Sequence, residues 1–389
     1  MNRGRPEPAA WTRRDLGVAA AGALVARSMR SIEDMAMDET FYVRPEELRL
    51  LALHPPGRRA LSFHNRFAGA TPSKAAFETW RAACRRKLAE LLGYRAPRPA
   101  SARKLRSVVR DGVTIEAWVM RADNDVELPA YLLRPRSERS ARSAVMAIHG
   151  HGEAEPCIGA RDDYHHQFAL RIAQAGWLAL CPEHRGFGAL RDMANSSPDH
   201  WLDYWGSRRG HQFTLVTDGF LYGKTLLGQT VEDLVRWEDW LSNEQGVRDV
   251  HAVGISYGGD LAMTYPPFSK RVRSIYCSGS MGSFSGVFAR CYNAPAHCVP
   301  HVLQWMDRSD IAGLSAPVPI RVHFGERDTP GPENASAAYN ETVQPSMREL
   351  RGVYGALKAD DRVSMRVTPG SEHEFEIGDI LAWLTERTT

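Results

Sequence analysis

The chain has 389 residues, and 49 Lys and Arg against 46 Asp and Glu leave a formal net charge of +3 at pH 7. Hydrophobic residues make up 43% and charged residues 24% of the chain, which excludes a disordered chain, a collagen-like chain and a disulfide-dense miniprotein. So small a charge excess cannot hold nucleic acid, and no uncharged apolar run reaches the roughly 20 residues of a membrane-spanning helix. We therefore expect a soluble protein with neither a nucleic-acid partner nor a membrane span.

Paired arginines stand near the start of the chain, in Thr12-Arg13-Arg14-Asp15-Leu16, and a mild apolar run from Gly17 to Ala26 follows them. This order resembles a twin-arginine export signal, although Asp15 and Gly17 match it weakly and no small-x-small cleavage site follows. We predict a disordered leader at residues 1–40 and export to the periplasm or the exterior. If the signal is not used, the protein stays in the cytoplasm.

The next two segments differ in the period of their apolar residues. Between Pro72 and Tyr94 apolar residues recur at helical spacing, which predicts an amphipathic helix within an N-terminal helical cap segment, residues 41–102. From Arg103 to Arg134 the period becomes two, with a turn at Asp111-Gly112. This change predicts antiparallel strands at the edge of a sheet.

From Ala144 onward, short apolar runs alternate with long helical segments. The runs cover residues 144–148, 177–180, 250–253, 272–276, 320–324 and 363–367. Runs that are apolar on both faces and alternate with helices predict parallel strands covered on both sides. The predicted fold class is therefore α/β, with a doubly wound, mostly parallel sheet in one domain spanning residues 103–389.

A G-x-S-x-G motif, Gly254-Ile255-Ser256-Tyr257-Gly258, lies between one of these predicted strands and a predicted helix. In that context the motif indicates a nucleophile elbow, in which a strained turn exposes a serine hydroxyl. Glycines two residues before and after Ser256 allow the strand and the helix to approach closely. The alternative is a chance match in a glycine-rich loop.

A serine nucleophile needs a general base and a group that orients the base, and both follow in the expected order. Asp328 and His373 each come just after a predicted parallel strand, at the sheet edge where such folds gather their sites. We predict Ser256 as nucleophile, His373 as base and then acid, and Asp328 as the residue that fixes the imidazole tautomer. Glu326 is the alternative acid, and a surface role between two glutamates is the alternative for His373.

Acyl transfer also requires hydrogen-bond donors that stabilise the oxyanion of the tetrahedral intermediate. The backbone N–H of Tyr257 is one predicted donor, and the backbone of His151, with Gly152 as alternate, is the second, because the loop His149-Gly150-His151-Gly152 follows a predicted strand. The same loop has an alternative as a metal site, together with the nearby residues Asp162, Asp163, His165 and His166. No helix signature for zinc accompanies these residues, so we predict no metal and no cofactor.

Three further features have two interpretations each. Arg185 is predicted to brace loops beneath the site through carboxylate or carbonyl groups, with a substrate contact as the alternative. The aromatic-rich stretch 200–222 could wall the pocket or only cover the core; its members are Trp201, Tyr204, Trp205, Arg208, Arg209, Phe213 and Phe220. Of the six cysteines, only Cys291 and Cys298 lie close enough in a loop-like stretch to suggest a local disulfide.

Taken together, these motifs make the region from Val113 to Thr389 similar to the α/β-hydrolase superfamily. Within it, the region resembles the bacterial dienelactone hydrolase and acetyl xylan esterase-like group. The motifs that carry the resemblance are His149-Gly150-His151-Gly152, Pro182-Glu183-His184-Arg185-Gly186-Phe187-Gly188, Gly223-Lys224-Thr225-Leu226-Leu227-Gly228, Gly254-Ile255-Ser256-Tyr257-Gly258-Gly259, Asp310-Ile311-Ala312-Gly313-Leu314-Ser315-Ala316-Pro317 and Gly370-Ser371-Glu372-His373-Glu374-Phe375. The resemblance implies hydrolysis of carboxylic esters through an acyl-enzyme, without metal or organic cofactor. Dienelactone hydrolases use a cysteine nucleophile, so Ser256 does not imply lactone opening.

The leading hypothesis is a serine carboxylesterase for small-molecule esters, which would include acetyl groups on carbohydrate if the export signal is used. A serine peptidase of the same fold is the alternative enzyme, and a non-catalytic binding protein is the third. The sequence predicts neither the acyl and alcohol groups of the substrate nor the oligomeric state.

Overall fold

The computed structural model describes residues 59–122, 126–137, 142–191, 210–285, 295–328 and 335–387. All of them belong to one compact unit, Gly57–Thr389. The predicted leader lies outside the described residues, and the segment boundaries at residues 40 and 102 stay predictions. No described helix combines the length and the apolar character needed to cross a membrane.

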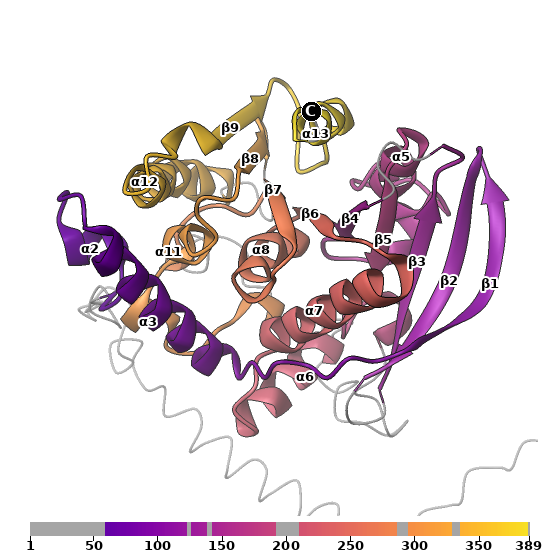
Figure 1. Ribbon diagram of the computed structural model, residues 1–389, viewed down its shortest axis with the longest axis horizontal. Coiled ribbons are helices and arrows are strands. Elements are labelled where there is room, and N and C mark those ends of the chain that lie inside the picture. The colour runs from indigo at the N-terminus through magenta and orange to yellow at the C-terminus, as the bar shows by residue number, and fades with distance from the viewer. Residues whose placement is uncertain are drawn as a thin grey trace, which may run out of the picture. The chain divides into compact units, whose positions relative to one another are not determined.

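One sheet carries the described strands, in the order β1-β2-β3-β5-β4-β6-β7-β8-β9 (Figure 1). Strands β1, β2, β3 and β5 pair antiparallel in that order, whereas β5, β4, β6, β7, β8 and β9 pair parallel. The sheet confirms the predicted fold class, including the antiparallel edge. The strands are β1 (Ala102–Arg110), β2 (Val113–Arg121), β3 (Glu127–Arg134), β4 (Ser143–Ile148), β5 (Leu178–Pro182), β6 (Asp249–Ile255), β7 (Val272–Ser278), β8 (Ile320–Gly325) and β9 (Val363–Thr368).

Helices cover both faces of the sheet, with α5 and α13 on one side and α7 and α8 on the other (Figure 1). The described helices are α2 (Phe63–Phe67), α3 (Lys74–Leu92), α4 (Ala154–Cys157), α5 (Phe168–Gln174), α6 (Gly210–Leu221), α7 (Leu226–Gln245), α8 (Tyr257–Thr264), α10 (Val302–Trp305), α11 (Arg308–Gly313), α12 (Ala335–Gly355) and α13 (Ile377–Glu386). The 3₁₀ helices are η4 (Gly188–Leu190), η5 (Pro266–Phe268), η6 (Pro295–His297) and η7 (Asp360–Arg362).

Strand β4 shows why the apolar runs are continuous. Its side chains alternate between the two faces, so Met146 and Ile148 enter one core and Val145 and Ala147 the other. All four side chains are fully buried. A strand buried on both faces needs apolar residues at every position. The continuous apolar run at residues 144–148 predicted this strand for that reason.

Helix α3 forms within the predicted range 72–94. The Ser73 hydroxyl caps its first turn by accepting from the N–H of Ala76 at 3.2 Å, and Gly93 ends it with φ 65°. A Cβ at Gly93 would overlap the backbone of Gly223, so α3 ends directly against the start of α7. The buried side chains of α3, including Trp80, pack into the same core as the α7 and α8 face of the sheet.

The buried ring of His251 in β6 makes folding stability depend on pH. Its Nδ1 lies 2.8 Å from the hydroxyl of Ser274, and burial lowers the pKa of His251 to about 4 from an ordinary 6.5. The unfolded chain therefore binds this proton at a higher pH than the native protein does. We expect the contribution of His251 to be complete above pH 6.5 and to fall by about 3 kcal/mol as the pH drops through 6.5 toward 4.

Urea unfolding at pH 8, 6.5, 5 and 4 measures this effect. In the double variant His251→Phe and Ser274→Ala, which removes the ring together with its hydroxyl partner, the loss of stability on acidification should be smaller by about 3 kcal/mol. Equal losses in the variant and the unaltered protein would contradict the expectation.

Candidate active site

Ser256 occupies the sharp turn between β6 and α8, with φ 57° and ψ −123°, a strained conformation for a residue with a side chain. Its N–H donates to the carbonyl oxygen of Ser278 on β7 at 2.9 Å. A Cβ at Gly254 would overlap the backbone of Gly258, and a Cβ at Gly258 would overlap the Ile148 carbonyl of β4. Both positions therefore require glycine, as the steric argument from the motif predicted.

The predicted base and its partner meet at the same sheet edge. Asp328 follows β8 and His373 follows β9, and the Nδ1–H of His373 donates to Asp328 Oδ1 at 2.8 Å. Gly279, the residue after β7, has φ 61°, and a Cβ there would lie 2.6 Å from His373 Cε1. Because the preceding residue, Ser278, bonds to the N–H of Ser256, the structure brings all three predicted side chains to one place.

Glu326, the alternative acid, lies elsewhere. Its carboxylate is exposed and accepts the N–H of Gly370 at 2.8 Å. Asp328 is only 4% exposed, so the buried carboxylate, not the exposed one, contacts His373.

The loop 149–152 follows β4 and lies against the elbow. Three side chains hold its backbone: His165 Nε2 accepts from the N–H of Gly150 at 2.9 Å, the hydroxyl of Tyr164 donates to the carbonyl of His151 at 2.6 Å, and His184 Nε2–H donates to the carbonyl of His149 at 3.2 Å. Tyr257 is the first residue of α8, where backbone N–H groups have no partner within the helix. The predicted oxyanion donors Tyr257, His151 and Gly152 therefore lie on two segments that flank Ser256.

Gly150 sets the distance between this loop and the elbow. A Cβ there would overlap the hydroxyl of Tyr164 and lie 2.9 Å from the Ile255 carbonyl oxygen and 3.0 Å from the Cβ of Ser256. Gly150→Ala should push the loop away from Ser256, lower kcat for an ester substrate by about 10²-fold and destabilise the fold by about 1–3 kcal/mol.

Steady-state kinetics and thermal unfolding of Gly150→Ala test this expectation, with Gly352→Ala as the control. Position 352 has open space around a Cβ and lies in α12, so alanine there should leave kcat unchanged and stabilise slightly. Unchanged kcat in Gly150→Ala would show that the loop tolerates the displacement.

Three of the four histidines that suggested a metal site, His149, His165 and His166, lie beside separate carboxylates, whereas His151 faces Ser256. Within the described ranges, no group of three or more His, Cys, Asp or Glu side chains is placed to hold a metal ion. Burial lowers the pKa of His165, and Asp163 offsets this shift only in part. The pairs are His149 Nε2 with Glu183 Oε1 at 2.9 Å, His165 Nδ1 with Asp163 Oδ1 at 2.9 Å, and His166 Nε2 with Glu374 Oε2 at 2.7 Å.

The segment 163–168 connects the two halves of the site. Besides holding the loop 149–152, this segment contacts the region after His373. The carbonyl oxygen of Tyr164 accepts from the N–H of Phe375 at 3.1 Å, and the rings of Tyr164 and His373 stack with their centroids 5.7 Å apart. His166 and Gln167 both have positive φ, 49° and 54°, so this backbone is strained. Sequence reasoning missed Tyr164 because its contacts link residues far apart in the chain.

The imidazole of His151 faces the hydroxyl of Ser256. Nδ1 of His151 lies 3.4 Å from Ser256 Oγ, and the ring of His151 stacks on that of His297 at 5.2 Å. His297 pairs through Nδ1 with the buried carboxylate of Asp260, which also accepts from Arg308 at 2.8 Å. Sequence reasoning did not find this chain of contacts; its one local signal is the acidic residue Asp260, two residues after the G-x-S-x-G motif.

Other predictions have mixed outcomes. Arg185 donates to both carboxylate oxygens of Asp233, at 2.6 and 2.9 Å, which confirms its bracing role. Phe220 at the end of α6 is 37% exposed. The other side chains named for this stretch, Trp201, Tyr204, Trp205, Arg208, Arg209 and Phe213, lie outside the described residues, as does Cys291 of the proposed disulfide.

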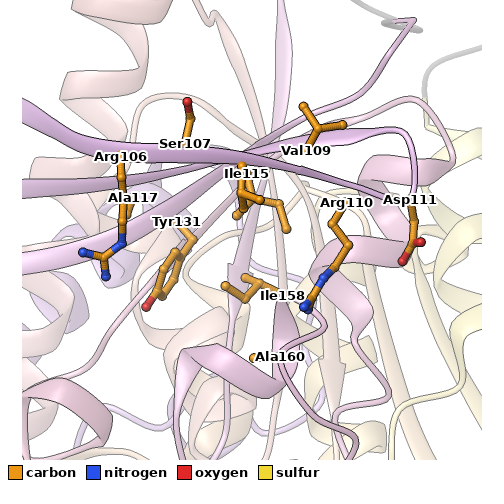
Figure 2. A pocket seen from close by; sticks show the side chains of 11 residues that line it. Arg106, Ser107, Val109, Arg110, Asp111, Ile115, Ala117, Tyr131, Ile158 and Ala160 are labelled. Atoms are coloured by element: carbon orange, nitrogen blue, oxygen red, sulfur yellow. The ribbon is translucent and has the colours of Figure 1, made fainter.

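A separate pocket opens beside the β1–β2 hairpin (Figure 2). Ile115 of the hairpin faces Ile158 across it, and Tyr131 lies at one end (Figure 2). Its lining contains none of Ser256, Asp328 and His373. This pocket is therefore distinct from the site around the elbow.

The sheet order, together with the strained G-x-S-x-G turn between β6 and α8, is that of the α/β-hydrolase fold. No family model matches the chain. A Bacillus subtilis (strain 168) protein named "Putative hydrolase YtaP" is 25% identical over 309 residues, which cover 76% of this chain and 94% of the relative.

Solved structures share the fold at low sequence identity. A "putative acetyl xylan esterase" from Bacteroides fragilis NCTC 9343 has a TM-score of 0.66 at 15% identity, covering 89% of this chain and 97% of the other. A glucuronoyl esterase from Solibacter usitatus has a TM-score of 0.56 at 12% identity, covering 87% and 99%. A methylesterase, BT1017, has a TM-score of 0.58 at 15% identity, covering 84% of this chain and 66% of the other.

Proposed function

We propose that the protein hydrolyses carboxylic esters through a serine acyl-enzyme. The observation that carries the proposal is the hydrogen bond between His373 and Asp328, 2.8 Å long, next to the strained turn at Ser256. The names of the structural neighbours, which include an acetyl xylan esterase and a glucuronoyl esterase, support the same class.

In this mechanism His373 Nε2 accepts the proton of Ser256 Oγ as the oxygen attacks the ester carbonyl carbon. The carbonyl electron pair moves onto its oxygen, and the N–H groups of Tyr257 and His151 stabilise the resulting charge. The C–O bond then breaks, and His373 returns the proton to the leaving alcohol. Asp328 holds the proton on Nδ1, so Nε2 is free to accept. Water repeats the sequence to release the acid, and no step requires a cofactor.

For the substrate we propose a small ester of a carbohydrate, with an acetyl group as the leading acyl group. Aromatic rings line one side of the nucleophile, because His151 packs against Phe187 at 5.5 Å and against Tyr257 at 5.9 Å. Phe187 and Tyr257 are themselves buried, so the partly exposed ring of His151 is the flat surface here on which a sugar can pack. The name of the Bacteroides fragilis neighbour supports the acetyl group.

Trapping with a fluorophosphonate, followed by peptide mass spectrometry, tests the nucleophile, and we expect the adduct on Ser256. Rates on p-nitrophenyl acetate, butyrate and octanoate and on aminoacyl anilides then test the reaction class. We expect the acetate to be turned over fastest. Dominant turnover of the anilides would favour the peptidase, and absence of both an adduct and turnover would favour a binding protein.

Exhaustive chelation tests the metal alternative separately. We expect the esterase activity to survive it, because the proposed chemistry uses side chains and backbone N–H groups alone. A complete loss that zinc restores would return the histidines to a metal-binding role.

We also propose that the chain is exported, on the support of the paired arginines Arg13 and Arg14. The intact mass of the protein from its native host tests this, because removal of a signal should give a mature chain that starts beyond Ala26. A full-length chain recovered from the cytoplasm would contradict it.

A further inference from the structure

The side chain of His151 lies beside Ser256, the proposed nucleophile. His373, with Asp328, fills the role of the base, and Nδ1 of His151 lies 3.4 Å from Ser256 Oγ. A group that close to the attacking oxygen is also close to the carbonyl oxygen of an ester whose carbon bonds to that oxygen. The side chain of His151 therefore has a position from which it can touch the reacting atoms.

The ring of His151 is held in place by other rings. Phe187 packs against its edge with an interplanar angle of 64°, and His297 stacks nearly parallel to it at 24°. His297 is fixed in turn by Asp260, a carboxylate buried beside Arg308. Burial raises the pKa of Asp260, but Arg308 and His297 lower it more, so the carboxylate stays ionised and holds the proton on His297 Nδ1.

The charge state of His151 suits a donor rather than a base. Burial lowers the pKa of His151 well below its ordinary value, and the neighbouring imidazoles His297 and His373 lower it further. At neutral pH the ring is uncharged, with one N–H and one lone pair. A neutral imidazole can donate to a developing oxyanion without carrying a net charge into a buried site.

We propose, on the basis of the function proposed above, that His151 is a further catalytic residue whose Nδ1–H donates to the oxyanion formed at Ser256. As the Oγ–C bond forms, the Oγ proton passes to His373 Nε2 and the carbonyl electron pair becomes the oxyanion. His151 keeps its own proton throughout and shares it as a hydrogen bond. When the oxyanion collapses, the C–O bond to the alcohol breaks and His373 protonates the alcohol.

Two amide substitutions test the position of this donor. The side-chain amide of asparagine reaches the place of Nδ1, whereas that of glutamine reaches the place of Nε2. We expect His151→Asn to keep kcat for p-nitrophenyl acetate within about tenfold of the unaltered protein, and His151→Gln and His151→Leu to lower kcat by about 10²-fold with little change in KM. His64→Leu, on the exposed surface of α2, serves as the control and should have no effect.

The outcomes separate this proposal from the function on which it rests. If the fluorophosphonate labels Ser256 but His151→Gln and His151→Leu keep full kcat, the donor role of His151 is wrong and the esterase proposal stands. If His151→Asn is as inactive as His151→Gln, and the acidic limb of the kcat/KM pH profile is lost in both, His151 is a base and the donor role is again wrong. If the unaltered protein is neither labelled nor active on esters, the esterase proposal itself fails.

Discussion

Replacing Ser256 by alanine should lower kcat for p-nitrophenyl acetate by on the order of 10⁶-fold, because nothing else at the elbow can form the acyl-enzyme. The substitution removes one oxygen from a turn that Gly254 and Gly258 shape, so the backbone at φ 57° should persist. Loss of activity should therefore occur without loss of fold. Binding and the oxyanion donors would leave a residual rate above that in water.

Kinetics, fluorophosphonate labelling and thermal unfolding measured on the same preparation check this result. Ser107→Ala, on an exposed position of β1, is the matched control and should retain full activity and full labelling. Ser256→Ala that kept a tenth or more of the activity would show that another residue is the nucleophile.

The second large effect is expected from Asp328→Asn, which should lower kcat by about 10⁴-fold. The carboxylate accepts the Nδ1–H of His373 at 2.8 Å, which keeps the proton off Nε2. An asparagine amide can donate to Nδ1 instead, and this favours the tautomer with the proton on Nε2. That tautomer cannot accept the proton of Ser256, although the side chains keep their places.

Glu326→Gln is the matched control, because Glu326 accepts the N–H of Gly370 at the surface and does not contact His373. It should change kcat by less than about twofold. The pH dependence of kcat/KM, measured for both variants, shows whether the base still titrates. A larger loss in Glu326→Gln than in Asp328→Asn would mean that the acid of the triad is misassigned.

Local patterns in the sequence were enough to predict the sheet. Each of the six apolar runs coincides with one parallel strand from β4 to β9, and in the central strands such as β4 burial on both faces demands apolar residues throughout. The ends of the strands were less predictable than their positions in the chain. Strand β5 extends to Pro182 because Cys181 and Pro182 pair with Tyr131 and Ala130 of β3, and composition does not reveal such a partner.

In the candidate site, too, some residues could be predicted from local patterns and others could not. The chain order of Ser256, Asp328 and His373, each after a strand, placed them at one sheet edge before their contacts were known. His165 instead suggested a metal ligand, because closely spaced histidines look alike in sequence whether they bind a metal or a backbone. Only the folded chain shows that its Nε2 accepts from Gly150 and that Tyr164 reaches His151.

The segment 163–168 makes the two halves of the site mechanically dependent on each other. It contacts the loop 149–152 through Tyr164 and His165, and the loop of His373 through Tyr164 and His166. A shift of this segment would misplace the proposed oxyanion donors and the proposed base together. Substitutions within it should therefore show non-additive effects when combined with changes in either loop, and the substrate range of the enzyme would be altered more readily from positions outside it.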